Sequence, residues 1–124
     1  MNKDIIDTRY KVYKTQIVLI LKKRQAYKDP DFSVETLASC MGTTRFKLVR
    51  IFSYLFDISP LKYINRCRVE CAKKYMKDPR LASVGVADIG LMAGFNSRFA
   101  FIYEFKRIEG MSPSEYRKIA LRCM

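Results

Sequence analysis

Histidine and tryptophan are absent from this sequence of 124 residues, and glycine and proline are scarce, with five and four copies. Without histidine, the chain lacks the side chain that most often serves as a general base or metal ligand near neutral pH. The sequence also has no glycine-rich phosphate loop, Walker pattern or nucleophile elbow. We therefore expect neither an enzyme nor a cofactor.

Long apolar runs are missing as well. The longest purely aliphatic run is IVLIL at 17–21, whereas a membrane-spanning helix needs about 20 apolar residues. The N-terminal stretch is basic and has no apolar segment of the kind found in secretory signals. These absences predict a cytoplasmic protein that does not enter a membrane.

Acidic residues are few, since 12 Asp and Glu stand against 24 Lys and Arg, giving a net charge of +12. So large a surplus on a small domain implies an anionic partner. Nucleic acid is the first candidate. Anionic lipid is the second, because the basic stretch 60–77 also carries an apolar stripe. A basic domain without any such partner is the remaining alternative.

The four cysteines, Cys40, Cys67, Cys71 and Cys123, do not show C-x-x-C spacing. Cys67 and Cys71 are one helical turn apart, where free cysteines pack as small apolar side chains. A zinc site would need all four cysteines because histidine is absent. We therefore expect core packing rather than a metal site, in a reducing compartment.

Apolar residues recur at intervals of three and four along almost the whole chain, which predicts an all-α fold. Capping residues, glycines and prolines divide the chain into seven helices. Their expected ranges are 9–27, 33–41, 44–56, 60–77, 86–93, 97–109 and 112–122.

Two segments of the chain match each other. Their offset is 52 residues up to a shared glycine and 53 after it, because the turn after Gly94 is one residue longer than the turn after Gly42. The matching pairs are Leu37 with Ile89, Gly42 with Gly94, Arg45 with Arg98, Phe46 with Phe99, Phe52 with Phe105, Ser59-Pro60 with Ser112-Pro113, and Tyr63 with Tyr116. We interpret them as two copies of one small unit, joined by the long helix at 60–77.

Each copy consists of a short helix, a tight glycine turn and a longer helix. Apolar residues from the two helices are expected to face each other: Leu37, Ala38 and Met41 with Leu48, Ile51, Phe52 and Leu55 in the first copy, and Ile89, Met92 and Ala93 with Phe101, Phe105 and Ile108 in the second. This arrangement is typical of a helix-turn-helix, whose second helix usually reads the DNA major groove.

The stretch from about Phe32 to Tyr116 resembles the DNA-binding domain of AraC/XylS-type bacterial transcription regulators. The resemblance rests on FSVETLASCMGTTRFKLVRIF with SPLKYINR, and on VADIGLMAGFNSRFAFIYEF with GMSPSEYR. It implies two helix-turn-helix subdomains held by a linker helix, each placing one helix in adjacent major-groove segments on one face of DNA. It also implies RNA polymerase as a protein partner and activation as the usual outcome, and many relatives carry a separate sensor or dimerisation domain.

The resemblance assigns base contacts to the second helix of each copy, where family members use the positions of Phe46, Val49 and Arg50. Arginine can pair bidentately with guanine, and the apolar residues can pack on thymine methyls. The alternative is that Phe46 and Val49 belong to the core and that Arg50 is only solvated. The candidate base contacts are Arg45, Phe46, Val49, Arg50, Arg98, Phe99, Ile102 and Tyr103.

The second copy departs from the family pattern, because Tyr103 stands where arginine is usual and Glu104 would repel phosphate if it faced the backbone. Reading of DNA shape, or phosphate contact through Arg98, is therefore an alternative for this helix.

Helix starts attract phosphate through free N–H groups. The candidate phosphate contacts are Thr43, Thr44, Lys47, Asn96 and Ser97, of which Thr44 and Ser97 are also good N-caps. The helix at 60–77 adds basic residues at Arg66, Arg68, Lys73, Lys74 and Lys77.

The expected organisation is an N-terminal tail or linker remnant at 1–12, a first helix-turn-helix subdomain at 13–58, a linker helix at 59–78 and a second subdomain at 79–124. The predicted function is sequence-specific binding of double-stranded DNA by a bacterial transcription regulator. The alternative is a helical protein-interaction module that does not read DNA. Strong salt dependence of binding would distinguish the first from the second.

Overall fold

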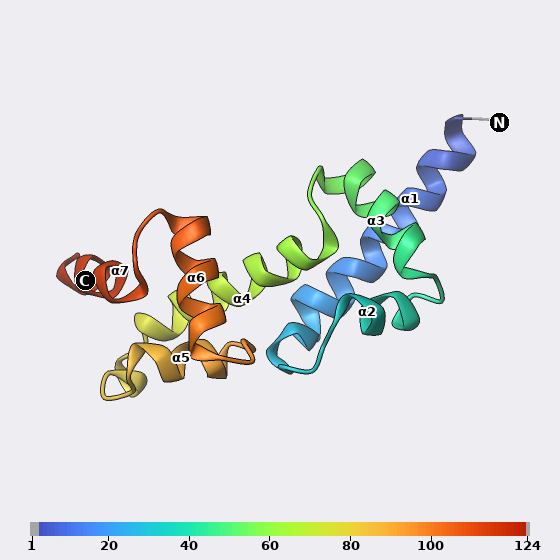
Figure 1. Ribbon diagram of the computed structural model, residues 1–124. Coiled ribbons are helices and arrows are strands. Elements are labelled where there is room, and N and C mark those ends of the chain that lie inside the picture. The colour runs from blue at the N-terminus through green and yellow to red at the C-terminus, as the bar shows by residue number, and fades with distance from the viewer. Residues whose placement is uncertain (1–2, 124) are drawn as a thin grey trace. The chain divides into compact units, whose positions relative to one another are not determined.

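The computed structural model describes the backbone of residues 3–123 and the side chains of residues 8–123, and it confirms the predicted all-α fold (Figure 1). The described residues form seven α-helices and no strand. The helices are α1 (Lys3–Ile17), α2 (Val34–Cys40), α3 (Arg45–Phe56), α4 (Pro60–Met76), α5 (Val86–Met92), α6 (Arg98–Glu109) and α7 (Pro113–Arg122).

The first helix differs from its predicted range of 9–27 at both ends. It begins at Lys3 and passes at Val18 into a π-helical stretch, Val18–Lys23, in which the N–H of Arg24 reaches back five residues to the carbonyl of Leu19 at 2.9 Å. Gln25 then takes a positive φ of 55°, which ends the helix because that backbone region does not belong to a right-handed helix. The apolar periodicity continues past this break, and a short 3₁₀ turn, Ala26–Lys28, follows.

The chain divides into two compact units. The first unit contains α1, α2, α3 and the start of α4 up to Ile64, and the second contains the segment 27–31 with the chain from Asn65 onward. Residues 3–12, part of the predicted tail, lie in α1. Residues 1, 2 and 124 lie outside the described residues. The subdomain limits expected from sequence, 13–58, 59–78 and 79–124, stay a prediction.

The core of the first unit forms where α2 and α3 meet across the Gly42 turn. Ser33 and Thr44 cap the two helices, because the hydroxyl oxygen of each accepts from an N–H three residues later, at 3.1 and 3.2 Å. The predicted apolar residues of the two helices are buried, with Leu55 half-buried: Leu37, Ala38, Met41, Leu48, Ile51 and Phe52. The end of α1 adds Ile17 to this core, and the π-helical stretch that follows adds Ile20 and Leu21.

The core of the second unit places α5 directly against α6. A Cβ atom on Gly90 would lie 2.2 Å from Cγ of Phe101, so only glycine permits this approach of the two helices. Ile89, Ala93, Phe101 and Phe105 are fully buried, as predicted. The prediction that Met92 belongs to this core is wrong, because the narrow buried side of α5 consists of Ile89, Gly90 and Ala93, and Met92 is left 42% exposed.

Arg68, one of the basic residues expected on the linker helix, is buried in α4 and does not belong to its charged surface. Its Nε donates to the carbonyl of Tyr27 at 2.8 Å and its Nη2 to the carbonyl of Asp29 at 3.2 Å. Gly94, with φ of 114°, packs against the same segment, and a Cβ there would lie 2.1 Å from the carbonyl oxygen of Tyr27. Arg68 and Gly94 thus fix the segment 27–31 in the second unit.

The end of the second unit follows the predicted capping pattern. Pro113 opens α7 and the hydroxyl of Ser112 accepts from the N–H of Glu115 at 3.2 Å. Arg117 of α7 donates to the carbonyls of Val84 at 2.6 Å and Leu81 at 2.9 Å, which attaches the loop before α5 to this helix.

Cys67 and Cys71 are buried in α4, as predicted, whereas Cys40 and Cys123 are exposed and all four are free thiols. No cluster of three or more potential metal ligands occurs among the described residues. Within the same part of the chain, no helix combines the length and the apolar composition needed to cross a bilayer.

Candidate nucleic-acid interface

Helix α3 has an inner face and an outer face, as the sequence predicts. The inner face holds Leu48, Ile51 and Phe52, which are at most 4% exposed. On the outer face Phe46 is 75% exposed and Val49 is 46% exposed. The alternative that Phe46 and Val49 are core residues is therefore wrong.

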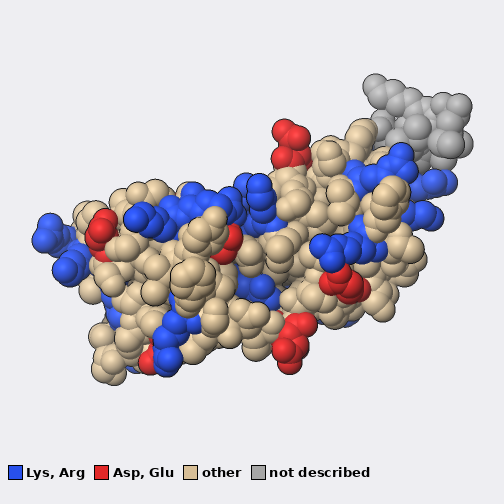
Figure 2. All heavy atoms as spheres, viewed as in Figure 1, with Lys and Arg blue, Asp and Glu red and all other residues tan. Residues whose placement is uncertain are grey.

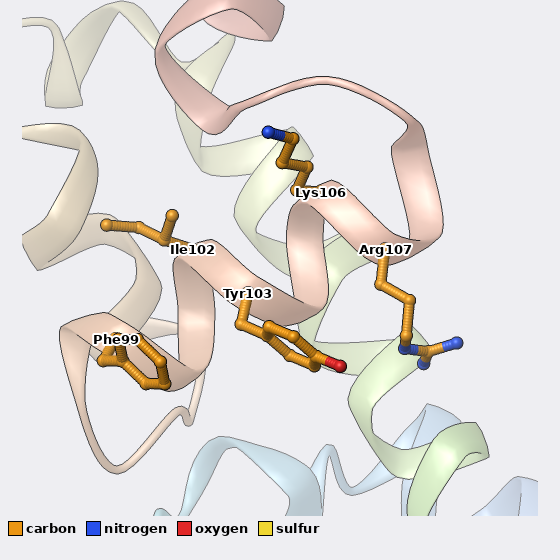
Figure 3. A pocket seen from close by; sticks show the side chains of 5 residues that line it. All are labelled: Phe99, Ile102, Tyr103, Lys106 and Arg107. Carbon is orange, nitrogen blue, oxygen red and sulfur yellow. The ribbon is translucent and has the colours of Figure 1, made fainter.

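Helix α6 repeats this division with different outer residues. Phe99 is 80% exposed, Ile102 45% and Tyr103 60%, whereas Phe101 and Phe105 are fully buried. The rings of Phe99 and Tyr103 lie nearly parallel, with 6.5 Å between centroids. Figure 3 shows these side chains projecting from successive turns of α6 around an open hollow, whose lining residues are Phe99, Ile102, Tyr103, Lys106 and Arg107.

The first residue of each outer helix forms an ion pair with the helix before the turn. Arg98 donates from Nη2 to Oδ1 of Asp88 in α5 at 2.9 Å, and Arg45 donates from Nη1 to Oε1 of Glu35 in α2. Both pairs span ten residues. Sequence reasoning missed the two acids, because at the offset of 52 residues that holds before the shared glycine Glu35 aligns with Ala87 and not with Asp88.

These ion pairs restrain the arginines without burying them. All four side chains are more than half exposed. The pKa of Glu35 is lowered, first by its own backbone N–H and next by the Arg45 guanidinium. Arg45 and Arg98 are thus accessible from solvent and already partly neutralised.

Arg50 differs from both of these arginines. It is exposed on α3 and forms no ion pair with any residue of the described chain. Its counterpart at the offset of 53 residues is Tyr103, so α6 carries a phenol where α3 carries a free guanidinium. The two outer faces therefore offer different chemistry to a ligand.

The start of each outer helix combines a side-chain cap with free backbone N–H groups. Thr44 and Ser97 are the caps, with acceptor distances of 3.2 Å to the N–H of Lys47 and 3.0 Å to that of Ala100. Asn96 and Lys47 are exposed beside them. The first-turn N–H groups that remain unpaired can bind an anion.

Thr43 is turned away from this position. Its N–H donates to the carbonyl of Ala38 at 2.9 Å, and its hydroxyl oxygen is buried and without a partner among the described residues. Neither polar group of Thr43 is presented to solvent, in contrast to Thr44.

Glu104 does not belong to the outer face of α6. Its side chain is only 17% exposed and accepts from Nη2 of Arg107 at 2.7 Å. The carboxylate is therefore paired and mostly covered, so the repulsion of phosphate considered from the sequence does not arise at the outer face.

The basic residues of α4 are not equivalent. Lys73 pairs with Glu109 at 2.9 Å and with Glu70 at 3.2 Å. Burial opposes its charge, but these two carboxylates outweigh burial and raise the pKa of Lys73. Lys74 is exposed and forms no ion pair with the described residues, which leaves it as the freer cation of the two.

On the face shown in Figure 2, Lys and Arg side chains occur over both units and acidic side chains are scattered between them.

Comparison with known proteins finds helix-turn-helix domains and transcription regulators that are similar to this chain. A family model described as a helix-turn-helix domain matches residues 37–119. A putative AraC-like transcription regulator of Streptomyces antibioticus is 32% identical over 94 residues, which are 74% of this chain and 30% of that protein. The chain thus spans about a third of the length of the curated relatives it matches.

Two solved structures share the fold. The DNA-binding domain of the global transcriptional factor AdpA, in complex with a target DNA, has a TM-score of 0.71 at 27% identity, covering 86% of this chain and 89% of that one. A transcriptional regulator of Chromobacterium violaceum with an AraC-type DNA-binding domain has a TM-score of 0.70 at 22% identity, covering 87% of this chain and 94% of that one. The second likeness shows the fold alone.

Proposed function

Since this chain belongs to the AraC family of helix-turn-helix domains, we propose that it binds double-stranded DNA in a sequence-specific manner. In this proposal α3 and α6 each enter one segment of the major groove, and the two segments are adjacent on one face of the duplex. The observation that carries it is the outer face that α3 and α6 both expose, next to a helix start able to hold phosphate.

The charge balance supports DNA as the partner. A net charge of +12 favours a polyanion, and neutralised phosphates supply affinity that does not depend on sequence. Thr44, Lys47, Asn96 and Ser97 are the proposed phosphate contacts, and Arg98 adds charge at the start of α6. Thr43 is left out of this set, because its hydroxyl is buried and its N–H already donates to the carbonyl of Ala38.

Base contacts supply the sequence preference. Arg50 is the proposed reader of guanine, because its guanidinium forms no ion pair with the described residues and can donate two parallel hydrogen bonds to O6 and N7. Phe46 and Val49 are placed for apolar contact beside it. Arg45, Phe99, Ile102 and Tyr103 complete the proposed set of base contacts together with Arg98.

The likeness to the AraC-like regulator of Streptomyces antibioticus and to the DNA-binding domain of AdpA supports a role in transcription. We place this role in the cytoplasm, where bacterial DNA lies, and propose activation with RNA polymerase as the protein partner. A sensor or dimerisation domain acting together with this one is a further proposal, in line with the greater length of the relatives. The function is binding rather than catalysis.

Selection of bound duplexes from a library with about 30 random base pairs, which exceeds two helical turns, tests the proposal. We expect a defined motif of two segments. Binding to the winning duplex should fall roughly a thousandfold between about 50 and 200 mM salt. If the library yields no motif and the affinity for DNA does not change with salt concentration, sequence-specific DNA binding is contradicted. That result would favour the alternative, a surface that binds another protein through apolar contacts.

A further inference from the structure

We propose that α6 recognises thymine through its C5-methyl groups, so that the DNA segment read by α6 is thymine-rich whereas the segment read by α3 contains an essential guanine. This inference rests on the proposed function and specifies the ligand of the second outer helix. It follows from what the outer face of α6 offers and from what it lacks.

After Arg98, which is ion-paired with Asp88, the exposed positions in the first half of α6 carry three large, mainly apolar side chains. Phe99, Ile102 and Tyr103 expose 80%, 45% and 60% of their surface. The near-parallel rings of Phe99 and Tyr103 flank the open hollow of about 450 Å³, with Ile102 beside it (Figure 3). Such a face presents methyl, methylene and ring carbon atoms to whatever it contacts.

The two arginines around this face are ion-paired, so neither offers guanine an unpaired guanidinium as Arg50 does. Arg98 is paired with Asp88, and Arg107 is paired with Glu104. Lys106 lies in the last turn of the helix, whereas base edges are contacted by residues near the start of a recognition helix. Lys106 is therefore assigned to a phosphate, and the Tyr103 hydroxyl is the one polar group that the three outer side chains bring to the bases.

The thymine methyl is the apolar group on the major-groove edge of a base pair. A G·C pair presents N7, O6 and N4–H₂ there, and an A·T pair presents as many polar groups, N7, N6–H₂ and O4, together with the methyl. An apolar face therefore favours thymine because only thymine offers an apolar group that the face can bury.

The first unit provides the internal contrast. Phe46 and Val49 occupy the positions of Phe99 and Ile102, but Arg50 stands where Tyr103 stands in the second. Arg50 is exposed and unpaired among the described ion pairs. The two halves of the target site should thus differ in kind, with guanine in one and runs of thymine in the other.

The experiment uses the winning duplex from the random library and the whole chain. Arg50→Ala and Ile102→Ala proteins first identify which half of the motif each helix reads, because each variant should relax preference in its own half only. Thymines in the Ile102 half are then replaced by deoxyuridine, which removes the methyl and keeps every hydrogen-bonding group. We expect a loss of about fourfold in affinity for each contacted thymine, the factor that corresponds to one buried methyl group.

Two further substitutions separate the methyl from other features of the base. Replacing the C of a G·C pair in this half by 5-methylcytosine should recover part of the affinity lost when thymine is changed to cytosine. At the thymine that Ile102 contacts, deoxyuridine should have no comparable effect in Ile102→Ala protein, since that contact is already gone, whereas thymines against Phe99 or Tyr103 should keep their sensitivity. Ile119→Ala is the matched control, because Ile119 is 49% exposed on α7 and is not part of the outer face.

A gain-of-function variant completes the test. Tyr103→Arg places a guanidinium at the position of Arg50 and should move the preference of this half from thymine toward guanine in a new selection. It should leave the Arg50 half of the motif unchanged.

The outcomes distinguish this inference from the proposed function. A library without any motif overturns both. A motif in which the Ile102 half is rich in G·C pairs, is missing, or binds equally well with deoxyuridine overturns thymine recognition and leaves DNA binding by α3 in place.

Discussion

Asp88 of α5 holds the guanidinium of Arg98 at the first position of α6, with 2.9 Å between Oδ1 and Nη2. Glu35 and Arg45 form the same contact between α2 and α3. Each pair joins the two helices of one helix-turn-helix at the end where DNA is proposed to lie. Because the side chains are exposed, the pair contributes little to stability, and we expect its effect on DNA binding to be larger.

The first prediction concerns Asp88→Asn. Removing this carboxylate leaves Arg98 unpaired and takes a negative charge away from the proposed phosphate contacts. Affinity for random-sequence duplex should rise up to about fivefold at low salt, which corresponds to the ~1 kcal/mol limit of an exposed pair. Fluorescence anisotropy with a labelled duplex measures it. Glu115→Gln, an equal charge change at an exposed site on α7, should have a smaller effect. The Arg98→Ala protein serves as the reference for a lost arginine contact. If Asp88→Asn lowers the affinity as much as Arg98→Ala does, then Asp88 is needed to position the arginine.

The second prediction concerns substitutions of Arg50. Arg50→Ala should cost about 1–3 kcal/mol on the selected duplex and relax preference at one base pair. Arg50→Lys keeps the positive charge but loses the planar fork, so its affinity for random DNA should stay near that of the parent protein while its discrimination falls. Competition between selected and random duplexes measures both quantities. An equal loss on the two kinds of DNA would assign Arg50 to a phosphate.

The third prediction concerns stability. Arg68→Met removes the donors to the carbonyls of Tyr27 and Asp29, and it should lower the free energy of unfolding by about 3 kcal/mol. Burial lowers the pKa of Arg68, with partial compensation from Asp29, which is consistent with a charge held inside by these contacts. Arg66→Met, at an exposed position on the same helix, should change stability by less than about 0.5 kcal/mol. Urea unfolding compares the two, and similar midpoints would refute the role of Arg68.

The fourth prediction is a pH dependence. Burial, and next the neighbouring Cys71, raise the pKa of Tyr27 well above its ordinary range. The folded state therefore holds the phenol proton more tightly than the unfolded state does. The contribution of the protonated phenol to the free energy of unfolding is fully present below about pH 10, the ordinary tyrosine pKa. It is lost as the pH rises toward the pKa that Tyr27 has in the folded state.

Tyr27→Phe should flatten this alkaline decline. Urea unfolding of both proteins between about pH 8 and pH 10.5 measures the difference, and lysine titration cancels because both proteins share it. Parallel curves for the two proteins over this range would exclude Tyr27 as the cause of the decline.

The outer and inner faces of α3 were predictable because they depend on helical periodicity alone. Leu48 and Phe52 are one turn apart and share a face, and Phe46 falls on the other. The end of the first helix was not predictable in the same way. The apolar pattern runs through Gln25, while the positive φ of this residue becomes apparent only with the backbone in place.

The prediction that Met92 is buried failed for a different reason. Its spacing from Ile89 fits a buried stripe, but Gly90 lets α6 approach so closely that the buried side of α5 is narrow and shifted away from Met92. Side-chain spacing along one helix does not report where the neighbouring helix lies.

Local sequence was enough to establish the seven helices, the caps at Thr44, Ser97 and Ser112, and the duplicated pattern, because capping and periodicity act over three or four residues. The partners of the charged side chains were settled by folding. Arg68 and the Tyr27 carbonyl are 41 residues apart in the chain, and no short-range pattern links them. Whether a basic side chain is buried, paired or free for an anion depends on which segments meet in space, and the packing of the helices determines that.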